Sequence, residues 1–422
     1  MIQKTREFLS NVSTTKKTIL RNTIWLSLAE IGSRIARGGL GIVAARMLGV
    51  SGLGVFSYAI ALGGFLTFFE DAGIATFVTR SFAKNEHDKH IIFGTALVLK
   101  IILGVVALLF FIGIGPLVST IPASRVIIPV IAFLMFCDAL RALFFSITRA
   151  EQRMHVDAKV QIITNTLIVI FGISFMMVSP TPLSLAWGYA LGSFIGTSIM
   201  FFVIRNYLPN IRKTFSRKLL NEIFFAAWPF TVLAISNVLI FNTDTLFLGY
   251  YGTTTDVGLY AAASRIVQMF YILASLFATS TFPTLVQKTQ DQSDIMSAIR
   301  KSLILMLVLA VPLMTIMILG SVPIMNILFG YSFVVGAPIL TILALSYIPV
   351  FILSILNNVV LALDKQKQFV IANIVGVVVN IALDVLLIPH YQGVGAAIAS
   401  VVGLTTITLI TGFKLRNHLF RN

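Results

Sequence analysis

Three charged side chains interrupt an otherwise apolar stretch near the N-terminus. In the segment AEIGSRIARGG, residues 29–39, Glu30 is followed by Arg34 four residues later and by Arg37 three residues after that. In a helix, this spacing places all three side chains on one face. Arginine presents a planar fork of N–H donors that matches phosphate and carboxylate oxygens, so this face could bind an anion.

The composition around these charges is that of a membrane protein. The 422 residues are 57% hydrophobic and 11% charged, with a mean hydropathy of +0.95. Soluble domains carry about 25% charged residues, and apolar segments of about 20 residues, the length of a membrane-spanning helix, recur here from end to end. We therefore expect an all-α polytopic membrane protein. Its polar and basic N-terminus does not have the pattern of a secretory signal peptide.

The hydropathy pattern predicts twelve transmembrane helices. Their expected ranges are 20–47, 52–79, 90–114, 125–149, 156–178, 182–205, 219–250, 257–286, 299–319, 334–362, 368–389 and 393–415. Several ranges exceed 25 residues, so those helices must tilt or protrude from the membrane.

The basic residues predict the orientation of these helices. With twelve spans, 24 of the 31 Lys and Arg residues fall on one side or at the span ends that face it, two fall at span ends on the other side, and five lie in the interior of the spans. The positive-inside rule places the 24 residues and both termini in the cytoplasm. We expect a multi-pass protein of the cytoplasmic membrane of a prokaryote. The net charge of +15 then reflects topology and some attraction to anionic lipid, and it does not indicate nucleic-acid binding.

The sequence carries no motif of a common catalytic or metal site. It has no P-loop and no H-E-x-x-H motif, its five histidines fall in loops or tails without metal-ligand spacing, and the loops expected outside the cell are short. We expect neither an enzyme nor a cofactor.

Two similar stretches suggest an internal repeat. LGVSGLGVFSYA at 48–59 and LGYYGTTTDVGLYAAA at 248–263 each join two spans, with Gly54 and Gly258 aligned 204 residues apart. Both stretches run in the same direction, so we expect two parallel six-helix lobes with a substrate path between them. The expected units are a basic cytoplasmic tail at 1–19, an N-terminal lobe at 20–206, a basic cytoplasmic linker at 207–218, a C-terminal lobe at 219–416 and a cytoplasmic tail at 417–422.

Arg34 would lie near the middle of the bilayer, where a charge costs about 2.5–3.5 kcal/mol on insertion scales. Glu30 could simply pair with Arg34 along the helix, but Arg37 would remain unpaired. We therefore expect this face to line a water-filled cavity. Lys100 and Arg265 also fall inside spans and would complete a cationic pocket that attracts anions.

The acidic and amide residues inside the spans leave more alternatives open. Glu30, Asp71 and Asp244 could carry a coupling ion or balance charge, although Asp244 could also form a structural salt bridge with Arg265. Asp138 and Arg141 are expected to pair locally, with a functional role as the alternative. Interhelical hydrogen bonds, or else a polar cavity, are expected for a set of three on one span. This set is Asn373, Asn380 and Asp384.

Three stretches of the chain resemble a known family. They are NTIWLSLAEIGSRIARGGLGIVAARMLGVSGLGVFSYA (22–59), NTDTLFLGYYGTTTDVGLYAAASRIVQ (242–268) and NIALDVLLIPHYQGVGAAIAS (380–400). They resemble the Wzx-type flippases of the multidrug/oligosaccharidyl-lipid/polysaccharide exporter superfamily. The resemblance implies two six-helix lobes around a central cavity that open alternately to the two sides of the membrane. It also implies transfer of a polyprenyl-diphosphate-linked oligosaccharide from the cytoplasmic to the outer leaflet for surface polysaccharide assembly.

The resemblance also suggests roles and partners. In the similar lipid II flippase branch, cavity arginines on the first and eighth helices meet the diphosphate, and Arg34, Arg37 and Arg265 lie on those helices here. That branch also has a basic residue on its second helix and two extra C-terminal helices, and this sequence has neither. An ion gradient or the membrane potential would drive transport, with the lipid-linked glycan and membrane lipid as partners and a polymerase and glycosyltransferases as candidate protein partners. The alternatives are a lipid II flippase, a multidrug or cation antiporter of the same superfamily, and a scaffold subunit.

Overall fold

The computed structural model describes residues 2–66, 74–84, 89–207, 215–290, 295–363 and 366–419. Within these ranges every regular element is helical, which confirms the all-α fold class. Nine of the described helical segments are long and apolar enough to cross a membrane, and two of these contain 40 and 48 residues. The count of twelve spans remains a prediction.

The helices follow one another with short connections. They are α1 (Ile2–Gly64), α3 (Ile74–Lys84), α4 (Lys89–Val118), α5 (Ile128–Ala150), α6 (Met154–Val178), α7 (Pro182–Ile204), α9 (Arg217–Tyr251), α10 (Thr254–Gln290), α11 (Ile295–Leu319), α12 (Ser321–Phe329), α13 (Ala337–Ala344), α14 (Tyr347–Ala362) and α15 (Gln366–Leu419), with 3-10 turns at Pro122–Ser124, Arg205–Tyr207 and Tyr331–Gly336.

Helices α1 and α15 each continue through a connection that the sequence placed between two spans. Helix α1 begins at Ile2, well before the expected start at residue 20, because neither glycine nor proline occurs before Gly32. It kinks at Gly49, whose φ of 69° is a left-handed conformation that glycine adopts without steric cost. Helix α15 kinks at Gln392, with φ of 47°, three residues after Pro389. Each kink falls at the predicted boundary between two spans.

The predicted span 334–362 is interrupted in the structure. Its residues form the end of a 3-10 turn, then α13 and then α14, with Leu345 and Ser346 between the two helices. Pro349 lies in the first turn of α14, where it cannot donate the hydrogen bond that a continuous helix would make to the carbonyl of Leu345. The proline therefore favours a new helix start over a straight span.

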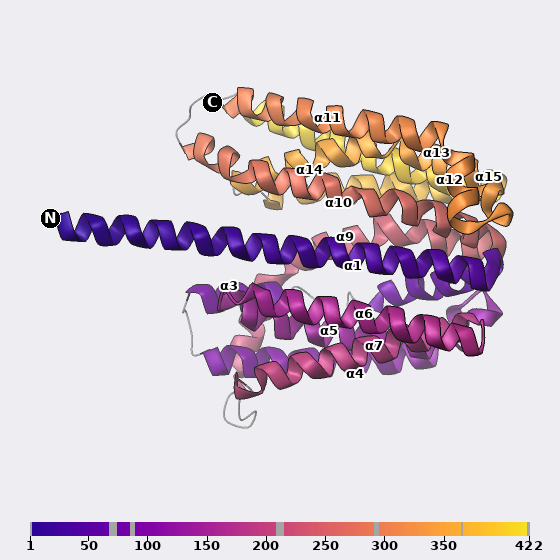
Figure 1. Ribbon diagram of the computed structural model, residues 1–422, viewed down its shortest axis with the longest axis horizontal. Coiled ribbons are helices and arrows are strands. Elements are labelled where there is room, and N and C mark those ends of the chain that lie inside the picture. The colour runs from indigo at the N-terminus through magenta and orange to yellow at the C-terminus, as the bar shows by residue number, and fades with distance from the viewer. Residues whose placement is uncertain are drawn as a thin grey trace.

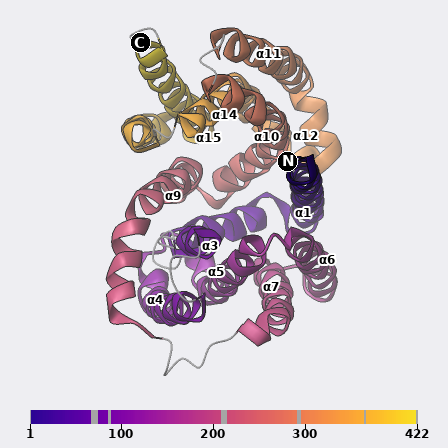
Figure 2. The same ribbon diagram turned by 90° about the vertical axis from the view of Figure 1, so that its left-hand side faces the viewer.

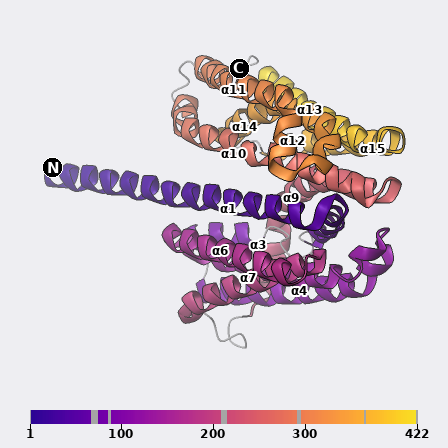
Figure 3. The ribbon, with the colours of Figure 1, turned by 45° about the vertical axis from the view of Figure 1, so that its right-hand side comes forward.

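The helices assemble into two lobes (Figure 1). The N-terminal lobe consists of α1 and α3–α7, and the C-terminal lobe of α10–α15, as the view along the long axis also shows (Figure 2). Helix α9 joins them: Leu219 near its start packs in an apolar cluster with Phe93 and Phe144 of the N-terminal lobe, whereas its later part lies beside α15. The two lobes diverge toward the side on which both termini lie (Figures 1 and 3).

The lobes touch closely at the end away from the termini. A Cβ atom on Gly54 would lie 1.9 Å from the carbonyl oxygen of Thr254, and one on Gly258 would lie 2.0 Å from the carbonyl oxygen of Val50. The two glycines aligned by the internal repeat thus allow α1 and α10 to approach reciprocally. The hydroxyl groups of Ser51 and Thr254 also hydrogen bond across this contact, at 2.7 Å. We call this contact the glycine gate.

Candidate functional site

A cavity of about 440 Å³ lies between the lobes and collects most of the charges predicted to face it. Its walls come mainly from α1, α5, α6 and α10. The charged residues that line it are Glu30, Arg34, Arg37, Asp138 and Arg265. We call it the arginine cavity.

Arg34 is paired with Glu30, as the spacing on one helix predicts. Its Nε donates to Oε1 of Glu30 at 2.8 Å, and the two side chains are 40% and 47% exposed. Arg34 also reaches the C-terminal lobe, because its Nη1 donates to the main-chain oxygen of Gln268 on α10 at 3.3 Å. This side chain therefore spans the boundary between the lobes.

Arg37 has no ion-pair partner among the described residues. Its Nε donates to Oδ1 of Asn165 on α6 at 2.6 Å. That amide is held in turn, because its Nδ2 donates to Oγ of Ser33 at 2.9 Å. The neutral contact orients the guanidinium of Arg37 without cancelling its charge.

Arg265 enters the cavity from the opposite lobe, and it likewise has no ion pair with a described acid. Its Nη2 donates to Oγ of Ser57 at 3.2 Å. Gly41 of α1 makes room for it, since a Cβ there would lie only 2.9 Å from Nη1 of Arg265. The alternative of a salt bridge between Asp244 and Arg265 is wrong, because Asp244 is surrounded by other partners.

Asp138 and Arg141 form the local pair expected from their spacing. Nη2 of Arg141 donates to Oδ1 of Asp138 at 2.5 Å, and its Nη1 donates to Oγ of Ser193 on α7 at 2.9 Å. A second cavity of about 250 Å³ continues from the arginine cavity along this pair and reaches Arg149. Because Arg141 compensates Asp138 and Arg34 compensates Glu30, the charge left over in the arginine cavity comes from Arg37 and Arg265. Such a site favours an anionic ligand.

A buried polar cluster occupies the C-terminal lobe around Asp244 of α9. Tyr260 and Ser400 both donate hydrogen bonds to Oδ2 of Asp244, and Nδ2 of Asn380 donates to its Oδ1 at 3.0 Å. Oγ1 of Thr243 donates to Oδ1 of Asn380 at 3.1 Å. Asn380 thus makes the interhelical hydrogen bonds that the sequence predicts, between α15 and α9.

Asp384 completes this cluster and is its most unusual member. Its side chain is fully buried beside Asp244, and neither carboxylate oxygen has a hydrogen-bond partner among the described residues. A buried carboxylate is stable only when a proton or a cation compensates it. The carboxylate oxygens of Asp244 and Asp384 are of the kind that a hard cation prefers.

Three predicted site residues lie elsewhere. Lys100 is only 1% exposed on α4, and it is absent from the lining of the arginine cavity and of the cavity that continues from it. Its side chain could not reach a ligand there without leaving the interior of the N-terminal lobe. Asn373 lines a separate cavity, with its Nδ2 donating to the main-chain oxygen of Phe369 at 3.2 Å. Asp71 lies outside the described residues.

Sequence reasoning missed the neutral amides of the site. Asn165 orients Arg37, and Nε2 of Gln161 donates to Oε2 of Glu30 at 3.4 Å. Gln268 lines both the arginine cavity and the separate cavity that contains Asn373. The only sequence signal was an uncharged polar residue within an apolar span, which is a weak one.

Comparisons with known proteins agree with this architecture. The chain matches the polysaccharide biosynthesis protein family over residues 19–288, and the MatE family over residues 229–386. It is 24% identical to a protein of Shigella flexneri that is named as an O-antigen transporter, over 90% of this chain and 94% of that protein. It is also 28% identical to the low-salt glycan biosynthesis flippase Agl15 of Haloferax volcanii, over 42% of this chain and 38% of that protein.

Two solved structures share the fold. One is the lipid II flippase MurJ in an inward closed conformation, with a TM-score of 0.72, 20% identity and coverage of 93% of this chain and 87% of that one. The other is an inward-facing multidrug resistance transporter of the MATE family, with a TM-score of 0.70, 14% identity and coverage of 94% of both chains. The two-lobe transporter fold implied by the resemblance is confirmed.

Proposed function

Since the chain belongs to the polysaccharide biosynthesis protein family, we propose that it is a flippase for polyprenyl-diphosphate-linked oligosaccharides. It moves these lipids from the cytoplasmic to the outer leaflet of a prokaryotic plasma membrane for surface polysaccharide assembly. The observation that carries this proposal is a pair of uncompensated guanidinium groups, Arg37 and Arg265, that face one cavity from opposite lobes. A diphosphate is the part of such a lipid that would need them.

The arginines would act by compensating the charge of the diphosphate while it crosses the membrane interior. Arg37 belongs to α1 of the N-terminal lobe and Arg265 to α10 of the C-terminal lobe, so a diphosphate bound to both would connect the lobes. Arg34, which already reaches Gln268, would form part of the same site. The polyprenyl chain would stay in the surrounding lipid, because it has no need of a polar path.

The conformation supports loading from the cytoplasm. The lobes are in contact at the glycine gate and diverge toward the two termini. The positive-inside rule assigns the termini to the cytoplasm. Release outside would then require the glycine gate to open and the opposite end to close, as in alternating access.

The resetting of the carrier would use a coupling ion at the Asp244 cluster. Asp384 and Asp244 share a buried site with too few hydrogen-bond donors for two carboxylates. A proton or a monovalent cation bound there would remove the imbalance. Glu30 already pairs with Arg34 and is better suited to charge balance.

Two alternatives remain within the same fold. The likeness to MurJ concerns the fold, and it leaves open transport of lipid II. A multidrug or cation antiporter is favoured less, because uncompensated arginines in the cavity would repel a cationic drug. The family match and the named relatives support a transporter rather than an enzyme or a scaffold subunit.

Lipid analysis of a strain that lacks this protein would test the proposal. We expect polyprenyl-diphosphate oligosaccharide to accumulate in the inner leaflet and surface polysaccharide to be lost. Accumulation of lipid II with intact surface polysaccharide would support the first alternative. Raised drug sensitivity without any lipid accumulation would support the antiporter. Pull-down of a polymerase or glycosyltransferases by the tagged protein would test the protein partners.

A further inference from the structure

A second large cavity, in the C-terminal lobe, has a different chemistry from the arginine cavity. It encloses about 620 Å³, a volume typical of small-molecule sites, and is bounded by α9, α10, α14 and α15. Arg34 is the only charged side chain among the described residues that line it. Its other polar groups are neutral amides and hydroxyls.

The three side-chain amides among the described lining residues come from three different helices. They belong to Gln268 of α10, Asn357 of α14 and Asn373 of α15. The side-chain amides of Gln268 and Asn357 make no hydrogen bond to a described residue, and that of Asn373 uses only one of its N–H groups. Each amide can therefore both donate to and accept from a ligand.

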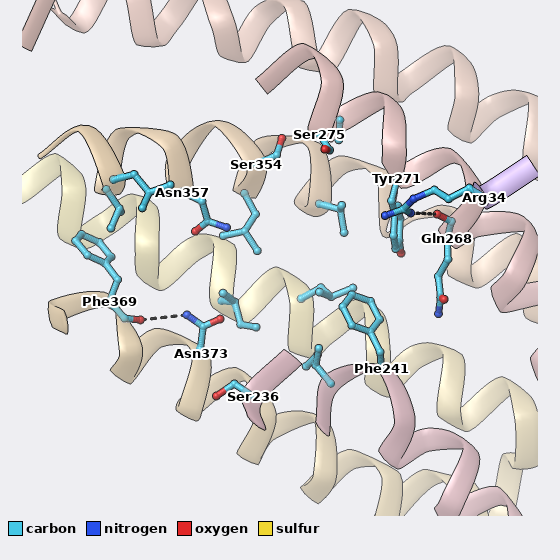
Figure 4. A pocket seen from close by; sticks show the side chains of 18 residues that line it. Arg34, Ser236, Phe241, Gln268, Tyr271, Ser275, Ser354, Asn357, Phe369 and Asn373 are labelled. Carbon is cyan, nitrogen blue, oxygen red and sulfur yellow. Dashed lines mark hydrogen bonds between the residues drawn. The ribbon is translucent and has the colours of Figure 1, made fainter. Parts of the chain in front are cut away.

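Aromatic rings form part of the wall between these amides. Tyr271 and Phe241 lie 6.4 Å apart, centroid to centroid, and the hydroxyl group of Tyr271 is fixed by a 2.7 Å hydrogen bond with Oγ of Ser346. Figure 4 shows Arg34 and Gln268 at one end of the cavity and Asn357 and Asn373 at the other. The cavity thus extends away from Arg34, and its wall combines amides, hydroxyl groups and aromatic rings with aliphatic side chains such as Leu353 and Leu404.

We propose that this cavity binds the neutral sugars nearest the diphosphate; this inference rests on the proposed flippase function. A sugar has an apolar C–H face and a rim of hydroxyl groups that donate and accept, which matches aromatic rings beside amides. The cavity shares Arg34 and Gln268 with the arginine cavity. A glycan attached to a diphosphate held at Arg34 would enter it directly.

Other occupants fit these groups less well. A polyprenyl chain would remove the amides of Asn357 and Gln268 from water without offering them a hydrogen bond, which is unfavourable. A cationic drug would find no acidic side chain among the described lining residues, and it would meet Arg34. A hydroxyl-rich neutral ligand satisfies both the apolar and the polar parts of the wall.

Binding to the purified protein in nanodiscs would test the proposal with two lipids. One is undecaprenyl diphosphate, and the other is the lipid-linked glycan that accumulates in a host strain lacking this protein. The main variant combines Asn357→Leu with Asn373→Leu, which nearly preserves side-chain volume and removes the hydrogen bonds. Asn326→Leu, at an exposed position of α12 outside the cavity, is the matched control.

We expect wild-type protein and the control to bind the glycan lipid about tenfold more tightly than undecaprenyl diphosphate, the gain from two hydrogen bonds. The double variant should lose this difference and bind undecaprenyl diphosphate as before. If the double variant does not fold, Asn357→Leu alone should reduce the preference for the glycan lipid by about threefold. Equal affinity of wild-type protein for both lipids would overturn the sugar site but leave the flippase function standing.

The remaining outcomes also decide between the two proposals. If the folded variant loses the same amount of affinity for both lipids, the cavity would be assigned to the polyprenyl chain and the sugar site would be overturned. Unchanged preference for the glycan lipid in that variant would place the sugars elsewhere. Failure of wild-type protein to bind either lipid would instead contradict the proposed function.

Discussion

Replacement of Arg265 by glutamine should weaken binding of a diphosphate lipid and leave folding intact. A hydrogen bond to a charged group is worth about 1.5–3 kcal/mol, and 1.4 kcal/mol corresponds to a factor of ten in affinity. Loss of one guanidinium should therefore reduce affinity by about 10- to 150-fold. Arg265 makes one hydrogen bond to Ser57 and no ion pair with a described acid, so the substitution leaves no carboxylate uncompensated.

The assay for this prediction is a titration of undecaprenyl diphosphate against the purified protein by native mass spectrometry. Arg125→Gln is the matched control, because Arg125 is exposed and lies away from both large cavities. The free energy of unfolding, measured by thermal unfolding in the same detergent, should change by less than about 1.5 kcal/mol for either variant. Affinity within twofold of wild-type protein for Arg265→Gln would refute the assignment of this arginine to the diphosphate.

Three further predictions concern the gate and the buried charges. Gly54→Leu should reduce delivery of lipid-linked glycan to the outer leaflet at least tenfold and leave binding intact, because the leucine side chain cannot fit against α10. Normal delivery by this variant in proteoliposomes would refute a gating role. Arg141→Gln should lower the free energy of unfolding by about 1.5–3 kcal/mol, because it removes a charged hydrogen-bond partner from Asp138, whose side chain is 30% exposed. Adding Asp138→Asn should restore much of the loss, and thermal unfolding of both variants measures this. The melting temperature of wild-type protein should be higher in sodium chloride than in choline chloride, and Asp384→Asn should abolish this difference. A sodium effect that persists in the variant would place the cation elsewhere.

Hydropathy and turn residues predicted the helices more reliably than their interruptions. The expected spans 156–178 and 182–205 agree closely with α6 and α7. Hydropathy reports whether a segment prefers lipid, and it is insensitive to one missing backbone hydrogen bond. For that reason the break before Pro349 was missed, although a proline within a span is a visible signal.

The charged part of the site was predictable because a charge inside a membrane is costly and needs a reason. This criterion selected Arg34, Arg37 and Arg265, which meet in one cavity. The same criterion also selected Lys100, which lies in the interior of the N-terminal lobe. The sequence does not show which helix faces another, so it could not separate Lys100 from the residues that line the cavity. Neutral amides such as Asn165 and Gln268 cost less to bury, and only the assembled lobes reveal them.

We propose that this protein carries a diphosphate-linked glycan across the membrane. Purified protein reconstituted in liposomes with its lipid-linked glycan in the inner leaflet tests it most directly, with a lectin outside reporting arrival. We expect the lectin to capture the glycan lipid with wild-type protein, and we expect the double variant Arg37→Gln with Arg265→Gln to abolish capture. Capture at the same rate in protein-free liposomes, or by the double variant, would contradict it.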